Sequence, residues 1–283
     1  MILAASNLAW KPDERIAAYT CIAEAGFRGL EIAPGLYFPE GVDTFSPSER
    51  EVSSARAEHE ALGLELVSMQ SLLYGTTDAA LFGPPDAFQR FVEGMERAIR
   101  LAGVIGCPNL VFGSPRQRIV PTSLSPASAQ SIATETFSRL GDLAAAAGAK
   151  LSLEFNPTAY GANYWTTWAQ VHAFVTELAH PAVRVCFDIG ATYLNDEVAV
   201  APDLLVERVA AVGHVHVSAP HLGIAPVDHG DTVALVAALK RARYGGAVSI
   251  EMLRPADEPL VVLAHAASQL ASAVAVVNGG PGT

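Results

Sequence analysis

Eight short apolar runs, each followed by a longer segment of helical periodicity, restrict the folds that this sequence can adopt. In the segment 87–105, for example, apolar residues recur at spacings of three and four, the pattern of an amphipathic helix. The predicted strands are residues 2–6, 28–32, 64–69, 109–113, 150–155, 183–188, 213–218 and 247–252. Unbroken apolar strands that alternate with helices are typical of parallel strands covered by helices. The alternation therefore predicts an α/β architecture, most simply a (β/α)8 TIM barrel.

The connections between the predicted elements support the barrel independently. Links from helix to strand are short and marked by glycine, as in EAGFRG, whereas links from strand to helix are long, as in NPTAYGANYWTT. In a barrel the long links gather on the C-terminal rim, where active sites are built. A doubly wound open sheet would also alternate but needs fewer strands, and no phosphate-binding glycine motif follows the first strand. We expect a single domain over residues 1–278 and a flexible tail over residues 279–283.

Composition and charge narrow the class of partners. The chain is 51% hydrophobic with a mean hydropathy of +0.29, which allows a large core. It has no uninterrupted apolar run of membrane-spanning length and no secretory pattern at its start, so we expect a cytoplasmic protein without a membrane partner. The net charge of −11 argues against a nucleic-acid partner. The scattered cysteines Cys21, Cys107 and Cys186 are expected to be reduced and to serve in packing.

Polar side chains end six of the eight predicted strands, in each case after an apolar run. They are Glu31, Gln70, Glu154, Asp188, His216 and Glu251. The last four are separated by about one strand–helix unit each, on the order of 30 residues, which places them on one rim. Two Glu, one Asp and one His suit a single divalent cation, for which we expect Mn²⁺ ahead of Mg²⁺ or Co²⁺. The alternative is a set of helix caps and structural pairs. Three carboxylates crowded on one rim argue against that alternative, because they repel one another.

The stretch VGHVHVSAP raises a choice between two histidines. Side chains two residues apart in a strand point to the same face, so both His214 and His216 can face the barrel interior. His216 is nearer the C-terminal rim and level with the carboxylates, and we expect it to be the metal ligand. For His214, one layer deeper, we expect a hydrogen-bonded core position.

The strand ends LEF, CFDIG, HVHVS and SIEM resemble those of the xylose isomerase-like sugar isomerase/epimerase superfamily. The sequence looks closest to the sugar phosphate isomerases/epimerases, which include the ketose 3-epimerases, and the resemblance covers nearly the whole chain. It implies a metal-dependent isomerase or epimerase of a keto-sugar or related polyol. In such an enzyme Glu154 and Glu251 are both metal ligands and proton carriers, one on each face of the substrate.

The same scaffold supports other reactions, so the reaction type stays open. A metal-dependent lyase or dehydratase acting on a keto-sugar, keto-inositol or dehydroshikimate-like acid is the alternative. A third hypothesis is a barrel that binds a sugar or a partner without catalysis, although such a protein has no need of two opposed glutamates.

Three positions depart from the pattern of the ketose 3-epimerases. That family has a Glu where Tyr160 stands, a His where Ala191 stands and an Arg where Leu222 stands. These departures argue against an ordinary free-ketose 3-epimerase. Ala191 also removes one of the extra histidines that the DNA-repair nucleases of the superfamily use for a trinuclear zinc cluster, so a nuclease is not expected.

Polar side chains at strand ends and in the long links are candidates for contacts with a small, carbohydrate-like substrate. The candidates are Glu31, Gln70, Arg116, Asn156, Tyr160 and His229. In the stretch GSPRQR, Arg116 and Arg118 are candidates for clamping a carboxylate or phosphate, with surface solvation as the alternative. We expect the links after the second, third and fourth strands to close over the substrate. The assembly is left open as a homodimer or a homotetramer.

Overall fold

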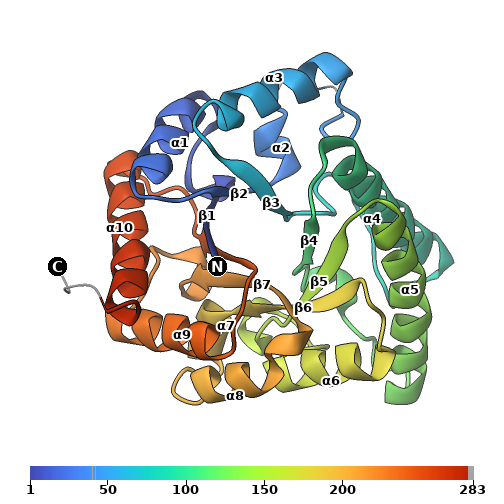
Figure 1. Ribbon diagram of the computed structural model, residues 1–283. Helices are drawn as coiled ribbons and strands as arrows, with labels where there is room; N and C mark the ends of the chain where they lie inside the picture. Colours follow the sequence, from blue (N-terminus) through green and yellow to red (C-terminus); the bar gives the residue numbers. More distant parts are fainter. Residues whose placement is uncertain (40, 42, 280–283) are drawn as a thin grey trace.

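Eight parallel strands close into a barrel in the computed structural model, which describes residues 1–39, 41 and 43–279 (Figure 1). Each strand pairs with the next one in the chain, and β8 pairs with β1. The strands are β1 (Ile2–Ser6), β2 (Gly29–Ile32), β3 (Glu65–Met69), β4 (Asn109–Phe112), β5 (Lys150–Glu154), β6 (Val183–Asp188), β7 (Val212–Ser218) and β8 (Ala247–Glu251). The predicted (β/α)8 barrel is confirmed, and the strand ends differ from the expected ones by about one residue at most.

A ring of helices surrounds the barrel in Figure 1 and buries the outer faces of the strands. The ring consists of α1 (Arg15–Glu24), α3 (Glu49–Glu60), α4 (Pro85–Ile105), α5 (Pro126–Ala146), α6 (Trp168–Leu178), α8 (Ala201–Arg208), α9 (His229–Arg241) and α10 (Pro259–Val277). Two short helices, α2 (Pro34–Tyr37) and α7 (Ile189–Leu194), belong to strand-to-helix links. Short 3-10 turns are η1 (Asn7–Ala9), η2 (Pro12–Glu14), η3 (Arg116–Arg118), η4 (Thr158–Tyr160), η5 (Val209–Ala211) and η6 (Pro220–Leu222).

Local sequence signals explain where the helices begin and end. Ser48 caps α3 by accepting a hydrogen bond from the Glu51 amide, and the Glu51 carboxylate accepts one from the Ser48 amide in return. Helix α4 ends at Gly106, whose φ of 72° belongs to the left-handed region that glycine adopts without strain. Such signals act within a few residues, which is why element bounds could be predicted closely.

Helix α10 is long and apolar enough to cross a membrane by length and composition alone. This was not expected from the sequence, because His265, Ser268 and Ser272 interrupt its apolar runs. In the structure α10 is the last helix of the ring and packs against α9 and α1 (Figure 1). Of the predicted tail, Gly279 lies in a turn after α10, and residues 280–283 lie outside the described residues.

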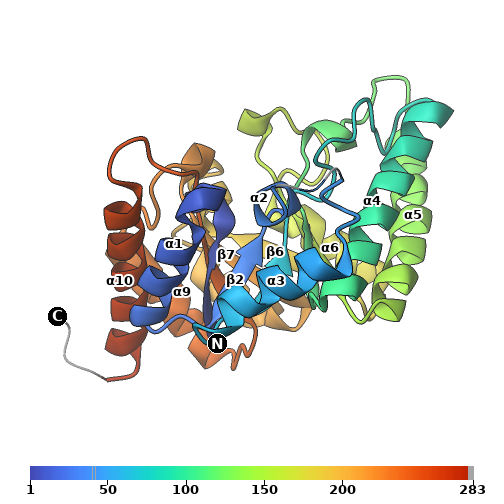
Figure 2. The ribbon, with the colours of Figure 1, turned by 90° about the horizontal axis from the view of Figure 1, so that it is seen from above.

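The long links lie at one end of the barrel, opposite the end at which the N-terminus enters β1 (Figure 2). Several buried polar side chains lie on the strands between the two ends. Near the N-terminal end, Asn109 donates a hydrogen bond to Ser68 Oγ at 3.0 Å and accepts one from Ser152 Oγ at 2.6 Å. His214 and Glu31 occupy the next layers, and both are fully enclosed. Buried polar side chains therefore extend along the barrel toward the C-terminal rim, where the predicted ligands lie.

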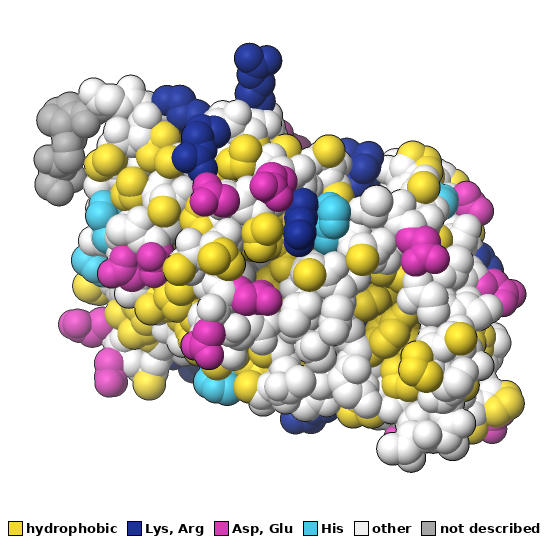
Figure 3. Space-filling model, turned by 90° about the horizontal axis from the view of Figure 1, so that it is seen from below, with side chains coloured by type: hydrophobic (Ala, Val, Ile, Leu, Met, Phe, Trp, Pro, Cys, Tyr) yellow, Lys and Arg dark blue, Asp and Glu magenta, His cyan; other side chains and the backbone are white. Residues whose placement is uncertain are grey.

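The distribution of charge on one face of the molecule can be compared with that of nucleic-acid-binding proteins. In Figure 3 acidic side chains are scattered among apolar ones, and Lys and Arg side chains stand singly or in small groups. No continuous basic stripe of the kind that tracks a phosphate backbone crosses this face.

Candidate metal centre

The C-terminal rim brings the four predicted ligands together. Glu154, Asp188 and Glu251 are the last residues of β5, β6 and β8, and His216 lies two residues before the end of β7. One side-chain atom from each of the four lies within 4.8 Å of the others. His216 Nδ1 is 2.9 Å from Glu154 Oε1 and 3.3 Å from Glu251 Oε2. The spacing of about one strand–helix unit therefore predicted a real cluster, called the quartet below.

His214 lies below the quartet, as expected from its place in the strand. Its ring is 5.0 Å from that of His216, measured between centroids, and its side chain is almost fully buried. Pairing of Asp188 with His216 across β6 and β7 sets the level of the ligands, and Cys186 faces His214 one step lower. Cys186 Sγ is 3.7 Å from both Glu154 Oε1 and His216 Nδ1, so this cysteine borders the quartet, whereas a packing role alone was expected.

Asp188 is held in place by the start of α7. Its Oδ1 accepts hydrogen bonds from the Gly190 amide at 2.7 Å and the Ala191 amide at 3.4 Å, and also from Ser218 Oγ. Residue 190 has to be glycine, because a Cβ there would overlap Ser218 Oγ. These contacts all fall on Oδ1, which leaves Oδ2 as the oxygen available to a cation. Ser218 was not predicted, but it lies on the same face of β7 as His216, two residues on, and that alternation was a usable signal.

Glu154 is supported by a buried arginine that sequence reasoning placed elsewhere. Arg118 is fully buried, and donates to the Glu154 carbonyl oxygen at 2.7 Å and to Asn156 Oδ1 at 2.8 Å. Asn156 in turn donates from Nδ2 to Glu154 Oε2 at 3.2 Å. Burial lowers the pKa of Arg118 to about 10, so the side chain remains a cation at neutral pH. The interpretation of Arg118 as a clamp for a substrate anion is therefore wrong: it holds the end of β5.

Gly113, directly after β4, makes room for the Glu154 carboxylate. A Cβ at this position would overlap Glu154 Oε2. The stretch VFGSP contains this glycine immediately after an apolar run, and its meaning became visible only when β4 and β5 were placed side by side.

The electrostatics of the quartet favour a bound cation. Burial, with help from the nearby Glu154 charge, raises the pKa of Asp188 to about 6. Burial likewise raises the pKa of Glu251 well above its usual range, although His216 opposes this. For His216, burial alone would lower the pKa, but the neighbouring Cys186, Glu251 and Glu31 raise it well above the ordinary value. Burial thus disfavours the negative charge of Asp188 and Glu251, and a cation bound beside them would offset that cost.

The donor set fits a divalent cation of intermediate hardness. Three carboxylates and one imidazole offer oxygen and nitrogen ligands that suit Mn²⁺, Mg²⁺ or Co²⁺. All four side chains are more than nine-tenths buried, so they are held by the barrel and not by mobile links.

A cavity of about 590 Å³ opens above the quartet. Four predicted substrate contacts line it together with Glu154, Asp188 and Glu251: Gln70, Arg116, Asn156 and Tyr160. The Tyr160 hydroxyl accepts a hydrogen bond from the His221 amide at 2.9 Å, which ties the link after β5 to the link after β7 across the cavity mouth. Another hollow, of about 440 Å³, lies between α4 and α5 on the outside of the barrel, is lined mainly by apolar side chains and contains no member of the quartet.

Two predicted substrate contacts lie elsewhere. His229 is the first residue of α9, is exposed to solvent and does not line the cavity. Glu31 is fully buried behind His216, with its Oε1 3.1 Å from His216 Nε2. His229 was expected in the link after β7, but the link ends at Asp228 and His229 begins α9, whereas Glu31 points from β2 toward the histidines of β7.

Comparisons with known proteins agree with this geometry. The sequence model of the family described as xylose isomerase-like TIM barrel matches residues 20–272. Among curated proteins no sequence match is found. An L-ribulose 3-epimerase structure is 17% identical, with a TM-score of 0.77 over 99% of this chain and 96% of the other. A 3-keto-D-glucoside 4-epimerase from E. coli is 19% identical, with a TM-score of 0.73 over 99% of both chains.

A further solved structure has the same fold. A D-psicose 3-epimerase, determined in the presence of D-fructose, is 15% identical, with a TM-score of 0.76 over 99% of this chain and 100% of the other. At such identities the likeness establishes the fold and not the reaction. The family match, by contrast, covers most of the sequence. On that ground the chain belongs to the xylose isomerase-like TIM barrel family.

Proposed function

We propose that the protein is a divalent-metal-dependent isomerase or epimerase that acts on a keto-sugar or a related polyol. One observation carries the proposal: Glu154 and Glu251, on strands separated by two others, share a quartet with Asp188 and His216 at the floor of a cavity. The fold neighbours named above are epimerases of keto-sugars, which supports the same substrate class. We expect Mn²⁺ as the cation, with Mg²⁺ or Co²⁺ as alternatives.

Glu154, Asp188, His216 and Glu251 would hold the cation. A divalent ion beside a carbonyl and a neighbouring hydroxyl polarises the carbonyl and makes the adjacent C–H more acidic. One glutamate then removes that proton as a general base, and the other, in its acid form, returns a proton to the opposite face. Return to the same carbon inverts it, whereas return to the carbonyl carbon moves the carbonyl along the chain. Asn156, by donating to Oε2, orients the Glu154 carboxylate.

The cavity walls select the substrate. Gln70 is held by a hydrogen bond from its Nε2 to Ser6 Oγ at 2.6 Å, and its carbonyl oxygen remains an acceptor for a substrate hydroxyl. Tyr160 and Leu222 line the cavity at two of the positions where the ketose 3-epimerases carry charged residues. The part of the substrate that faces them is expected to be less polar than the corresponding part of a free ketose, as in a glycoside.

The alternative is a lyase on the same site, and Arg116 is the observation that favours it. This side chain lines the cavity and is exposed, and no ion pair to it is found among the described residues. An arginine without an internal carboxylate partner suits a substrate that brings its own, such as a keto acid. Loss of a hydroxyl two bonds from the acidified carbon would then eliminate water.

The test is incubation of the metal-loaded protein with a panel of ketoses, keto-glycosides, keto-inositols and cyclic keto acids in D₂O. An isomerase or epimerase returns products of unchanged composition that have gained one carbon-bound deuterium. A lyase returns products lighter by one water. Absence of deuterium exchange and of water loss across the panel, with metal bound, would contradict both.

A further inference from the structure

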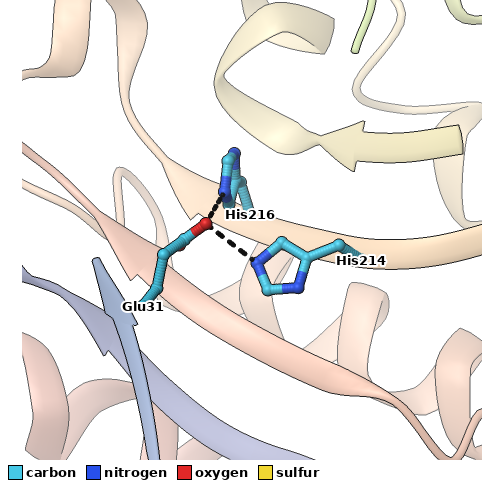
Figure 4. Close-up of side chains that lie close together, drawn as sticks. All are labelled: Glu31, His214 and His216. Carbon is cyan, nitrogen blue, oxygen red and sulfur yellow. Dashed lines mark hydrogen bonds and ion pairs between the residues drawn. The ribbon is translucent and has the colours of Figure 1, made fainter. Parts of the chain in front are cut away.

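The Glu31 carboxylate, from β2, faces both His216 and His214 of β7 (Figure 4). Its Oε1 is 3.1 Å from His216 Nε2 and 3.4 Å from His214 Nε2, and its Oε2 has no hydrogen-bond partner within the described residues. Glu31 and His216 are fully buried, and His214 nearly so. No substrate can reach this carboxylate, although the sequence placed it among the substrate contacts.

The two nitrogen atoms of His216 therefore face different surroundings. Nδ1 points to Glu154 and Glu251, at the level of the quartet, whereas Nε2 points to Glu31. An ionised carboxylate can only accept hydrogen bonds, so the nitrogen that faces it has to carry a proton. A histidine that is protonated on Nε2 and binds a metal presents the lone pair of Nδ1, which is the nitrogen that the quartet needs.

Glu31 points from β2 toward His216 and His214 of β7. The register between β2 and β3 shifts between Leu30 and Glu31, where β3 contributes one extra residue, Val67. His214, from β7, faces the same carboxylate oxygen from below without hydrogen-bond geometry.

From this arrangement we propose that Glu31 is a positioning residue that fixes the orientation and protonation of the His216 ring so that Nδ1 is presented to the metal. The proposal rests on the metal site of the proposed function. The alternative is that Glu31, His214 and His216 bind a second metal ion, which lies deeper in the barrel than the quartet and is called the inner ion. That inner ion would need the lone pair of His216 Nε2 while Nδ1 served the quartet, and a neutral imidazole cannot offer both.

The experiment compares the wild-type chain with Glu31→Gln, in which the amide is nearly the same size but carries both a donor and an acceptor. Glu60→Gln is the matched control, because Glu60 is an exposed residue of α3 and its replacement changes the net charge equally. Titration calorimetry with Mn²⁺ is expected to give one ion per wild-type chain and an affinity about 10- to 100-fold weaker for Glu31→Gln, with no change for Glu60→Gln. Thermal unfolding without metal shows whether each variant is folded.

A second measurement reads the ring itself. In the Mg²⁺-loaded wild-type protein, ¹⁵N NMR of the histidine side chains is expected to show His216 with its proton fixed on Nε2. In Glu31→Gln the amide can also donate to Nε2, so part of the His216 population should carry its proton on Nδ1, and those chains cannot bind the metal through that nitrogen. A purely structural role for Glu31 would lower the unfolding temperature without moving this resonance. If Glu31→Gln does not fold, Glu31→Asp, which keeps the charge and withdraws the oxygen by one methylene, should weaken Mn²⁺ binding in the same direction.

The outcomes separate the proposals. Unchanged Mn²⁺ affinity and unchanged His216 protonation in a folded Glu31 variant would overturn the positioning role. Two ions per wild-type chain, falling to one in Glu31→Gln, would overturn it in favour of the inner ion. A wild-type chain that binds no divalent ion would instead refute the proposed function, on which this inference depends.

Discussion

His216 and His214 differ by two positions in one strand, yet the structure gives them separate tasks. His216 contacts Glu31 through Nε2 and Glu154 and Glu251 through Nδ1, whereas His214 contacts Glu31 from the layer below. The choice of His216 as the ligand rested on its nearness to the rim, and its place within the quartet agrees with that choice.

Metal analysis of two single variants tests this assignment. His216→Ala removes the imidazole of the quartet and should lose most of its bound Mn²⁺ after dialysis against a metal-free buffer. His214→Ala should keep about one ion per chain, because no atom of His214 belongs to the quartet. The reverse result, metal lost from His214→Ala and kept by His216→Ala, would show that the ion lies one layer deeper than we propose.

The two glutamates are expected to do more than hold the ion. Glu154→Gln and Glu251→Gln each keep an oxygen ligand of similar size but remove the basic carboxylate. Measured at saturating Mn²⁺, each variant should lose at least about 10²–10⁴ in kcat, the usual contribution of general acid–base catalysis. If one saturated variant kept a wild-type kcat, that glutamate would be a ligand only, and another residue would have to carry the proton.

At the scale of elements, the link that follows β4 serves two purposes. Its 3-10 turn η3 contains Arg116 and Arg118, which are two residues apart and point to different places. Arg118 lies inside and holds β5 through the Glu154 carbonyl, whereas Arg116 remains exposed at the cavity. Composition could not separate them, because both arginines occupy the same short polar stretch.

A matched pair of variants separates the two arginines. Arg118→Met should lower the free energy of unfolding by about 2–5 kcal/mol, because it leaves two buried acceptors, Glu154 O and Asn156 Oδ1, without their donor. Arg116→Met removes an exposed charge and should leave the stability within about 0.5 kcal/mol of wild type. Denaturant unfolding of both proteins gives the two values, and equal values would refute the division of tasks.

Arg116→Met should also change KM, which can be measured once a substrate is known. Arg116→Met should raise KM for a carboxylate-bearing substrate by about 10-fold or more, as expected for the loss of a charge-assisted hydrogen bond. A neutral analogue of the substrate provides the control, and its KM should stay the same. If KM for the acidic substrate were unaffected, Arg116 would be a solvated surface residue, which is the alternative that the sequence left open.

At the scale of the whole molecule, the barrel concentrates negative charge at one end of its interior. The chain carries a net charge of −11, and three carboxylates of the quartet share the rim with one imidazole. A bound cation should therefore stabilise the fold as well as serve the reaction. At about 100 times its dissociation constant, a ligand that binds only the folded state contributes about 2.7 kcal/mol.

Removal of the metal and lowering of the pH should both lower the unfolding temperature of the Mn²⁺-loaded protein. A carboxyl whose pKa is raised to about 6, as for Asp188, holds a proton below that pH, and the proton competes with the cation. At pH 7.5, saturating Mn²⁺ should raise the unfolding temperature by about 5 °C relative to the EDTA-treated protein. At pH 5.5 the same concentration should raise it less. Differential scanning calorimetry at both pH values checks this, and a larger rise at the lower pH would contradict it.

The sequence alone determined the barrel, the bounds of its strands and the position of the four predicted ligands at or near the strand ends. These follow from the period of two in strands, from the period of 3.6 in helices and from caps and glycines, all of which act over a few residues. Mn²⁺ preference, substrate and reaction type are not encoded at that range, and they remain predictions.

Only the tertiary structure decided the tasks of Glu31, Arg118, Ser218 and Gly113. Glu31 meets His216 because barrel closure places β7 across the interior from β2. Arg118 meets the end of β5 because its link folds back under the cavity. Each of these contacts joins residues far apart in the chain, and its geometry depends on barrel closure and strand register, which no local pattern specifies.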